Sequence, residues 1–325
     1  MKLKKIKRMV VAGTAILMTL SLAGCGIGRE SVKLGAAGVG GGYYAFSNAF
    51  AQIASSEDED LDFEVKATAG STANIRLLSD GYVDMAIAQA DLVDAAYNGT
   101  GATDKKRYRG YSAVASLYTE ACQIVVRADS GIDSLDDLQG KKISVGEEES
   151  GTQRNAEQIL KMTGLVESLV DTVNLDYVDA ANELKSGQID AFFCTAGIQT
   201  SVIEELSKEC DVKLIGIDDK CRDRLKSVYG FYTDYTIPAG TYEGQTQDVV
   251  TLGVRAVLLA RDDMDEKIVE ELTGLLFEHA QDIQYSIALT FQIDESEAVK
   301  NVTIPFHDGA KAYYQKKGIE IPAEQ

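Results

Sequence analysis

Histidine is scarce in this sequence, and the absence of familiar cofactor motifs narrows its possible functions further. Only His279 and His307 are present, which argues against a histidine-rich metal site and a histidine-dependent catalytic triad. The glycine run that begins at Gly38 has Tyr43 where a dinucleotide fingerprint needs a third glycine, and residues 140–142 (GKK) lack the Ser or Thr of a P-loop. The sequence therefore indicates no cofactor and no metal, and it offers no catalytic residue.

Basic residues are outnumbered by acidic ones. The chain has 32 Lys and Arg against 51 Asp and Glu, and its net charge is −19. The first 24 residues hold five of the basic residues and none of the acidic ones, so the remainder carries a net charge of −24. Such a surface repels phosphate backbones, so nucleic acid is excluded as a natural partner.

The one long apolar run lies at the N-terminus. Five basic residues precede an uncharged stretch over residues 9–22, and small residues then lead to Cys25. This order predicts a secretory signal peptide over 1–24, and the run is shorter than the ~20 residues of a spanning helix. The cut before Cys25 resembles the lipobox of bacterial lipoproteins, in which that cysteine is lipidated; the alternative is an ordinary signal peptide followed by a chance cysteine. We expect residues 25–28 to form a lipidated linker that anchors the protein on the extracytoplasmic face of the cell membrane.

Four cysteines follow Cys25, with spacings typical of no zinc or redox motif. Cys122 and Cys194 lie in apolar runs and are interpreted as small core residues. Cys210 and Cys221 flank one apolar run, and export permits a disulfide between them. Their spacing leaves that pairing open.

Short apolar runs alternate with longer amphipathic ones from residue 29 onward. This alternation predicts an α/β fold with a mostly parallel sheet. The expected strands are 32–36, 63–67, 83–88, 111–117, 122–126, 142–145, 191–194 and 213–217, and the expected helices include 44–54, 72–79, 155–163 and 268–283. Residues 229–251, which are rich in tyrosine and turn residues, interrupt the pattern.

Three expected helices begin at segments suited to an anion. Residues 38–44 are rich in glycine, Ser71 is expected to cap the helix 72–79, and Ser150 precedes the helix 155–163. Free N–H groups and the positive end of the helix dipole at each start can bind a small carboxylate. Each segment alone is more often a simple cap, but three such starts follow strands in one chain, and ligands bind α/β sheets at the carboxyl ends of strands, where these turns lie.

Other polar residues end expected strands. Gln89 emerges at the end of strand 83–88, and Tyr118 and Glu120 follow strand 111–117. One ring of the pair Phe192 and Phe193 is a candidate to line a cleft. For each aromatic residue the alternative is packing in the core.

Six segments together resemble the TAXI family, the solute-binding proteins of one class of TRAP transporters. The matching segments are 40–53 (GGGYYAFSNAFAQI), 68–91, 115–146, 149–160 (ESGTQRNAEQIL), 236–249 and 304–318. Their order and spacing span nearly the whole chain after the signal peptide.

The resemblance implies a type II periplasmic-binding-protein fold with two lobes, two hinge crossovers and a ligand in the cleft. Lobe 1 would comprise residues 29–127 and 252–325, and lobe 2 residues 128–251. The family binds glutamate, related amino acids such as glutamine, and small carboxylates, and its members deliver them to a TRAP permease driven by an ion gradient. A monomer is expected.

The resemblance also implies which residues face the ligand. They are Tyr43, Tyr44, Ser71, Thr72, Asn74, Gln89, Tyr118, Ser150, Gly151 and Thr152, with Phe193 and Thr195 as weaker candidates. The sequence departs from the family at 147–149, where three glutamates occupy an approach that often contains glycine. These carboxylates oppose a strongly anionic ligand unless they point to solvent, and Arg76 or Arg154 are near enough in sequence to compensate.

Two alternatives stay open beside a TRAP-type binding protein. The first is an exported binding protein that serves a sensor or another type of transporter, with the same fold and site. The second is an extracellular enzyme on the same scaffold, although no Ser/His/Asp set, metal cluster or cofactor motif supports it.

Overall fold

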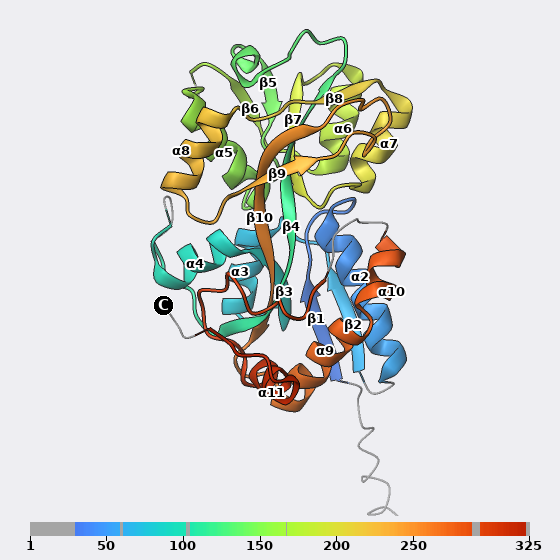
Figure 1. The fold of residues 1–325 in the computed structure, drawn as a ribbon, viewed down its shortest axis with the longest axis vertical. Coiled ribbons are helices and arrows are strands. Elements are labelled where there is room, and N and C mark those ends of the chain that lie inside the picture. Colours follow the sequence, from blue (N-terminus) through green and yellow to red (C-terminus); the bar gives the residue numbers. More distant parts are fainter. Residues whose placement is uncertain (1–29, 59–60, 102–104, 167, 288–292, 323–325) are drawn as a thin grey trace, which may run out of the picture.

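The computed structural model describes residues 30–58, 61–101, 105–166, 168–287 and 293–322. The predicted signal peptide and Cys25 lie outside these residues. Two lobes are stacked along the long axis and share two long strands, β4 (Tyr111–Arg127) and β10 (Val249–Arg261) (Figure 1). No helix in the described part of the chain has the length and apolar character needed to cross a membrane.

The first lobe contains the N-terminal and C-terminal segments. Its strands are β1 (Glu30–Gly35), β2 (Leu61–Lys66) and β3 (Met85–Gln89), and β1 pairs in parallel with both others. Its helices are α2 (Gly42–Glu57), α3 (Ser71–Ser79), α4 (Ala90–Asn98), α9 (Glu266–Glu278), α10 (Ala280–Ile287) and α11 (Asp308–Lys317). Leu34, Phe46, Ile87 and Leu258 lie in its core and are fully or almost fully buried.

The second lobe contains the middle of the chain. Its strands are β5 (Lys142–Ser144), β6 (Asp171–Val173), β7 (Ala191–Ala196), β8 (Val212–Leu214) and β9 (Thr233–Ile237). Its helices are α5 (Gly151–Thr163), α6 (Tyr177–Ser186), α7 (Ser201–Glu209), α8 (Asp219–Val228) and the short 3-10 helix η1 (Leu135–Leu138). Successive side chains of a strand face opposite sides of a sheet, so Phe192 and Phe193 pack into two different apolar clusters of this lobe.

One continuous mixed sheet runs through both lobes in the order β2-β1-β3-β10-β4-β7-β5-β6. The α/β fold with two lobes and two crossover strands is confirmed, but the sheet is less parallel than expected. β10 is antiparallel to β3, β4 and β9, and β4 is antiparallel to β7 and β8. The reason is that β4 and β10 carry the chain between the lobes in opposite directions. The boundaries expected at 127/128 and 251/252 fall on these shared strands and stay a prediction.

Two local expectations were wrong. The strands expected at 111–117 and 122–126 are one strand, because β10 pairs with the residues between them, such as Thr119 and Glu120. The helix expected over 268–283 divides at His279 into α9 and α10. The segment 229–251, for which no element was predicted, contains β9 and the start of β10, which pair with each other.

The described cysteines are free thiols, so the open pairing of Cys210 with Cys221 is not formed.

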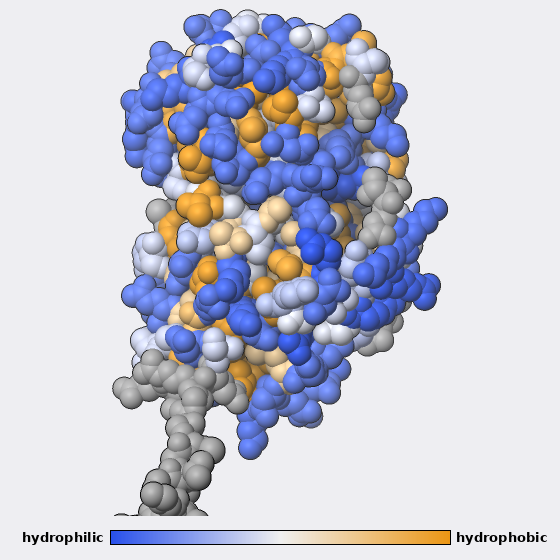
Figure 2. Space-filling model, turned by 180° about the vertical axis from the view of Figure 1, so that it is seen from behind, coloured by the Kyte–Doolittle hydropathy of each residue, from blue (hydrophilic) through white to orange (hydrophobic). Residues whose placement is uncertain are grey.

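The face seen from behind is hydrophilic over most of both lobes, with apolar residues in separate patches (Figure 2). This surface fits the large excess of acidic residues in the sequence.

Candidate functional site

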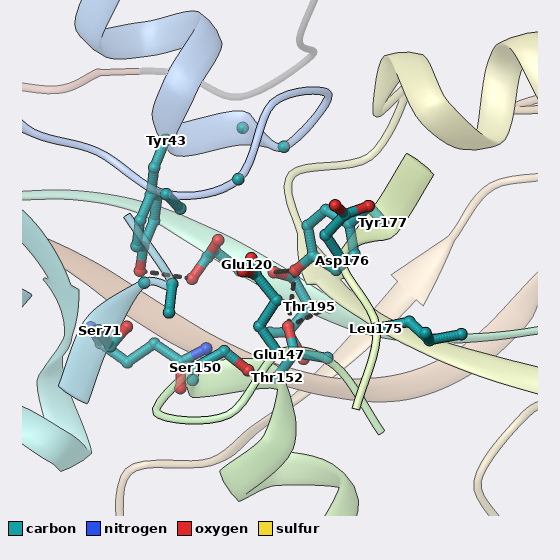
Figure 3. Close-up of a pocket in the computed structure, with 18 residues that line it drawn as sticks. Tyr43, Ser71, Glu120, Glu147, Ser150, Thr152, Leu175, Asp176, Tyr177 and Thr195 are labelled. Carbon is teal, nitrogen blue, oxygen red and sulfur yellow. Dashed lines mark hydrogen bonds between the residues drawn. The ribbon is translucent and has the colours of Figure 1, made fainter. Parts of the chain in front are cut away.

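A pocket lies between the two lobes, and both lobes contribute to its lining (Figure 3). The residues that line it are Ala37, Gly38, Gly41, Gly42, Tyr43, Ala69, Gly70, Ser71, Gln89, Glu120, Glu147, Ser150, Gly151, Thr152, Leu175, Asp176, Tyr177 and Thr195. The pocket therefore meets the first turns of α2, α3, α5 and α6, the ends of β3 and β7, and the middle of β4.

The first lobe contributes a linked set of polar side chains. The Tyr43 hydroxyl, in the first turn of α2, donates to Glu120 Oε2 at 2.7 Å, and Figure 3 shows these two groups pointing toward each other. The backbone N–H of Gln89 donates to Ser71 Oγ at 3.1 Å. Ser71 is the first residue of α3 and does not cap it, because Gly70 takes the N-cap position and the Ser71 hydroxyl is turned to β3.

The second lobe contributes the first turn of α5. Ser150 caps this helix as predicted, because its Oγ accepts the N–H of Gln153 at 2.9 Å. Thr152 Oγ1 accepts the backbone N–H of Thr195 at 3.2 Å and lies 2.6 Å from the Tyr177 hydroxyl. Tyr177 in turn donates to the Thr195 carbonyl at 3.1 Å. These bonds hold the end of β7 against the starts of α5 and α6.

Acidic residues dominate the electrostatics of the pocket. Glu120 is 2% exposed, and burial raises the pKa of its carboxyl group to about 8, although hydrogen bonds from Tyr43 and Gln89 oppose the rise. Burial also raises the pKa of Glu147, and the nearby Asp176 carboxylate adds to this effect. Among the residues that the structure describes, no Lys or Arg lines the pocket.

The structure brings seven of the twelve predicted ligand-facing residues to this pocket. These are Tyr43, Ser71, Gln89, Ser150, Gly151, Thr152 and Thr195. Five others do not line it, namely Tyr44, Thr72, Asn74, Tyr118 and Phe193. Contact with a ligand stays a prediction for the seven.

Three of these five residues have other roles in the structure. The Asn74 amide is buried and donates to the carbonyls of Ala36 and Ile87, so it holds the ends of β1 and β3. Tyr118 packs against Phe46 with ring centroids 6.3 Å apart. Phe193 lies in the core of the second lobe.

The start of α3 is already occupied by protein. The backbone N–H groups of Thr72 and Ala73 donate to the Glu149 carbonyl of the second lobe at 3.1 and 3.2 Å. Glu149 adopts a left-handed backbone conformation (φ 65°), and its carboxylate pairs with Arg76 at 2.7 Å. The anion site expected at Ser71 is therefore a contact between the lobes.

The three glutamates at 147–149 have separate environments. Glu147 lines the pocket, Glu148 is exposed, and Glu149 makes the contact with Arg76. Arg154, the other basic residue expected to compensate, lies near Glu157 and outside the pocket lining. Of the three glutamates, only Glu147 therefore lies in the pocket lining.

Sequence reasoning missed several residues of the site. Glu120 was noted only as the end of a strand, yet it is the single carboxylate within a strand of 17 residues, which is a visible signal. Asp176 and Tyr177 were not predicted, because the start of α6 carries no glycine-rich or Ser-Gly-Thr segment. No group of three His, Cys, Asp or Glu residues in the described ranges has the geometry of a metal site.

The family assignment comes from a match to the NMT1-like family model over residues 34–318. The chain belongs to the NMT1-like family. Similar solved structures of this NMT1-like chain include MatC of Rhodopseudomonas palustris with bound malate, at 14% identity and a TM-score of 0.57, with 82% of this chain and 91% of that chain covered. A protein of Bordetella bronchiseptica RB50 is similar at 18% identity and a TM-score of 0.53, with coverage of 90% and 83%. A putative L-cystine ABC transporter protein of Listeria monocytogenes has 14% identity and a TM-score of 0.50, with coverage of 79% and 94%. At these identities the likeness shows a shared fold.

Proposed function

We propose that this NMT1-like chain is an exported solute-binding protein that captures a small carboxylate-bearing solute between its lobes and delivers it to a membrane permease. The observation that carries the proposal is the position of the pocket. Its lining comes from both lobes and from the shared strand β4, so one solute would contact both bodies at once. A ligand that contacts both lobes favours the closed arrangement over the open one.

Two helix starts in the pocket suit a carboxylate. The first turns of α2 and α5 contribute Gly42, Tyr43, Gly151 and Thr152 to the lining. The N–H groups of a first turn have no acceptor within their own helix and lie at the positive end of its dipole. The malate bound to MatC is a small carboxylate held by a protein of similar fold, which supports this class of solute.

Contacts between the lobes give the closed state its own stabilisation. The Gln89 amide donates to Asn155 Oδ1 at 3.0 Å, and Ser201 Oγ donates to the Gly40 carbonyl at 3.2 Å. The Arg76–Glu149 pair is partly exposed, so it contributes at most about 1 kcal/mol. The permease would recognise the closed surface that these contacts define.

The resemblance to the TAXI family supports a TRAP permease as the membrane partner. The alternative is a permease of the ABC type, which the similar putative L-cystine ABC transporter protein of Listeria favours. Growth on the identified solute, after deletion of each candidate permease gene, separates the two. Loss of growth on deletion of the TRAP permease gene supports our proposal, and loss of growth on deletion of an ABC permease gene overturns that part of it.

Lipidation of Cys25 would keep the protein on the extracytoplasmic face of the cell membrane. The Cys25→Ser variant should leave the membrane fraction, because the acyl chains supply the anchoring energy. A variant that stays in the membrane fraction would contradict the lipid anchor.

Thermal unfolding of the full-length protein with a panel of amino acids and small carboxylates tests the binding function. A solute that binds only the folded state raises the melting temperature. Gly151→Ala should abolish the shift, because a Cβ there would lie 2.5 Å from the Gln89 side chain. The matched control is Gly230→Ala, where a Cβ meets no atom within 4 Å. A panel without any shift would overturn the proposed function.

A further inference from the structure

Hydrogen-bond acceptors are in excess in the pocket. Glu120, Glu147 and Asp176 come from three separate segments, and no lysine or arginine in the described part of the chain lines the space. The nearby Arg76 is held by Glu149 of the other lobe. A solute that enters this pocket therefore meets three carboxyl groups and, among the described residues, no basic side chain that offsets them.

The Gln89 amide is a second, independent observation. Gln89 is 2% exposed, and its Nε2 donates to Asn155 Oδ1 at 3.0 Å. Its Oε1 is buried with no hydrogen-bond partner among the described residues. A buried acceptor without a donor is costly, so this oxygen is a place for a donor from the solute.

The Glu120 carboxylate lies next to this amide. A hydrogen bond from Gln89 helps to stabilise its ionised form, and the Tyr43 hydroxyl supplies another. The other titratable groups around it are Tyr118 and Cys122 on β4, Asp91 on α4, and Cys194, Tyr177 and the two remaining acids in the second lobe. None of these groups is a cation.

We propose that the solute carries a protonated amine, which donates to the Glu120 carboxylate and to Gln89 Oε1. This inference rests on the proposed function and narrows its solute class. The carboxylate of the same solute would lie against the first turns of α2 and α5. Glu147 and Asp176 then disfavour a second carboxylate, so a zwitterionic amino compound without net negative charge fits better than a glutamate-like dicarboxylate.

A metal ion is a poorer occupant than an amine. The described residues contain no group of three acidic, histidine or cysteine side chains with metal-binding geometry. The Tyr43 hydroxyl also donates to Glu120 Oε2, so it competes with a metal ion for that carboxylate oxygen. One ammonium group between Glu120 and Gln89 can donate one hydrogen to the Glu120 carboxylate and another to Gln89 Oε1.

Matched pairs of probes test the inference on the full-length protein. The pairs are L-glutamine with glutaramate, L-alanine with propionate, and L-glutamate with glutarate. Isothermal titration calorimetry at pH 7 gives the dissociation constants. We expect the amine-bearing member of a binding pair to bind at least about tenfold more tightly, because a charge-assisted hydrogen bond is lost in the other.

Substitutions then assign the effect to residues. Glu120→Gln should weaken binding of the amine by at least about tenfold and leave binding of the deaminated acid unchanged or stronger. Glu147→Gln should improve L-glutamate relative to L-glutamine, because it removes a like charge. Glu148→Gln is the control, since Glu148 is adjacent but exposed, and should change both constants less than twofold.

A second readout is the proton balance. Because burial raises the pKa of Glu120 to about 8, an ammonium group should ionise this carboxyl on binding and release up to one proton. Titrations in buffers with different ionisation enthalpies measure that release, which Glu120→Gln should abolish. If Glu120 had only a structural role, Glu120→Gln would change the affinity without changing the number of protons released.

The outcomes separate this inference from the proposed function. Tighter binding of deaminated acids, or no effect of Glu120→Gln on a folded variant, would overturn the amine assignment while the binding function stands. If no member of any pair binds, both fail. Amine-selective binding that Glu120→Gln removes supports both.

Discussion

Replacing Glu120 by glutamine should change how the stability of the ligand-free protein depends on pH. Glu120 is buried beside Tyr43, Tyr118 and Gln89, and none of the described residues that shift its pKa is a cation. Burial disfavours its ionised form in the folded state and leaves the unfolded state unaffected. The neutral amide of Glu120→Gln can still accept the Tyr43 hydroxyl, but it cannot ionise.

The magnitude follows from the change in pKa on folding. The pKa of Glu120 rises from its ordinary 4.5 to about 8. Because the pKa is higher in the folded state, the stability that the protonated Glu120 carboxyl contributes is fully present below pH 4.5. It is lost as the pH rises toward 8. A tenfold change in an ionisation constant corresponds to about 1.4 kcal/mol. At pH 7 this carboxyl therefore lowers the free energy of unfolding by about 3 kcal/mol relative to its effect below pH 4.5.

Urea denaturation at half-unit steps from pH 5 to pH 9 measures this effect. The difference in unfolding free energy between Glu120→Gln and wild type should grow in favour of the variant up to about pH 8 and then level. Asp91, whose pKa burial raises to about 6, is present in both proteins and largely cancels from the difference. Glu148→Gln should show no such trend. A difference between Glu120→Gln and wild type that is flat from pH 5 to pH 8 would refute the reasoning.

Three further substitutions test other parts of the structure. Asn74→Ala removes the side-chain donor to the Ile87 carbonyl and one of the two side-chain donors to the Ala36 carbonyl, and urea denaturation should show a loss of about 2 kcal/mol. Arg76→Ala removes a half-exposed pair with Glu149, so stability should change by less than about 1 kcal/mol while the dissociation constant rises up to about fivefold; an unchanged constant would show that the pair does not help to close the lobes. Gly253→Ala would place a Cβ 2.5 Å from the Thr119 side chain between β10 and β4, and thermal unfolding should show a loss of about 1–3 kcal/mol, whereas an unaffected melting temperature would show that the crossover yields easily.

Much of the fold was accessible from the sequence because its periodicity is local. Phe46, Phe50 and Ile53 repeat at helical spacing and lie on α2, and the apolar run of β3 is buried at all five positions. The crossover strands were harder to predict. Glu120 interrupts an apolar run, and only the pairing with β10, which is far away in the sequence, shows that the strand continues through it.

The candidate site was partly accessible for the same reason. Ser150 and Gly151 carry a local capping pattern, and the structure brings them to the pocket. Two other features depend on contacts between distant segments. Ser71 Oγ accepts the Gln89 N–H, and the Glu149 carbonyl accepts the N–H groups at the start of α3. Helical and strand periodicity contain no information about such contacts.

The most direct test of the central claim is the position of the solute in a crystal structure of the full-length protein with the probe that gives the largest thermal shift. We predict electron density for one solute between the lobes, with its amine near Glu120 and Gln89 and its carboxylate near Gly42 or Gly151. Density elsewhere, such as in the surface pocket beside Tyr235 and Pro238, with the space between the lobes empty, would contradict the account.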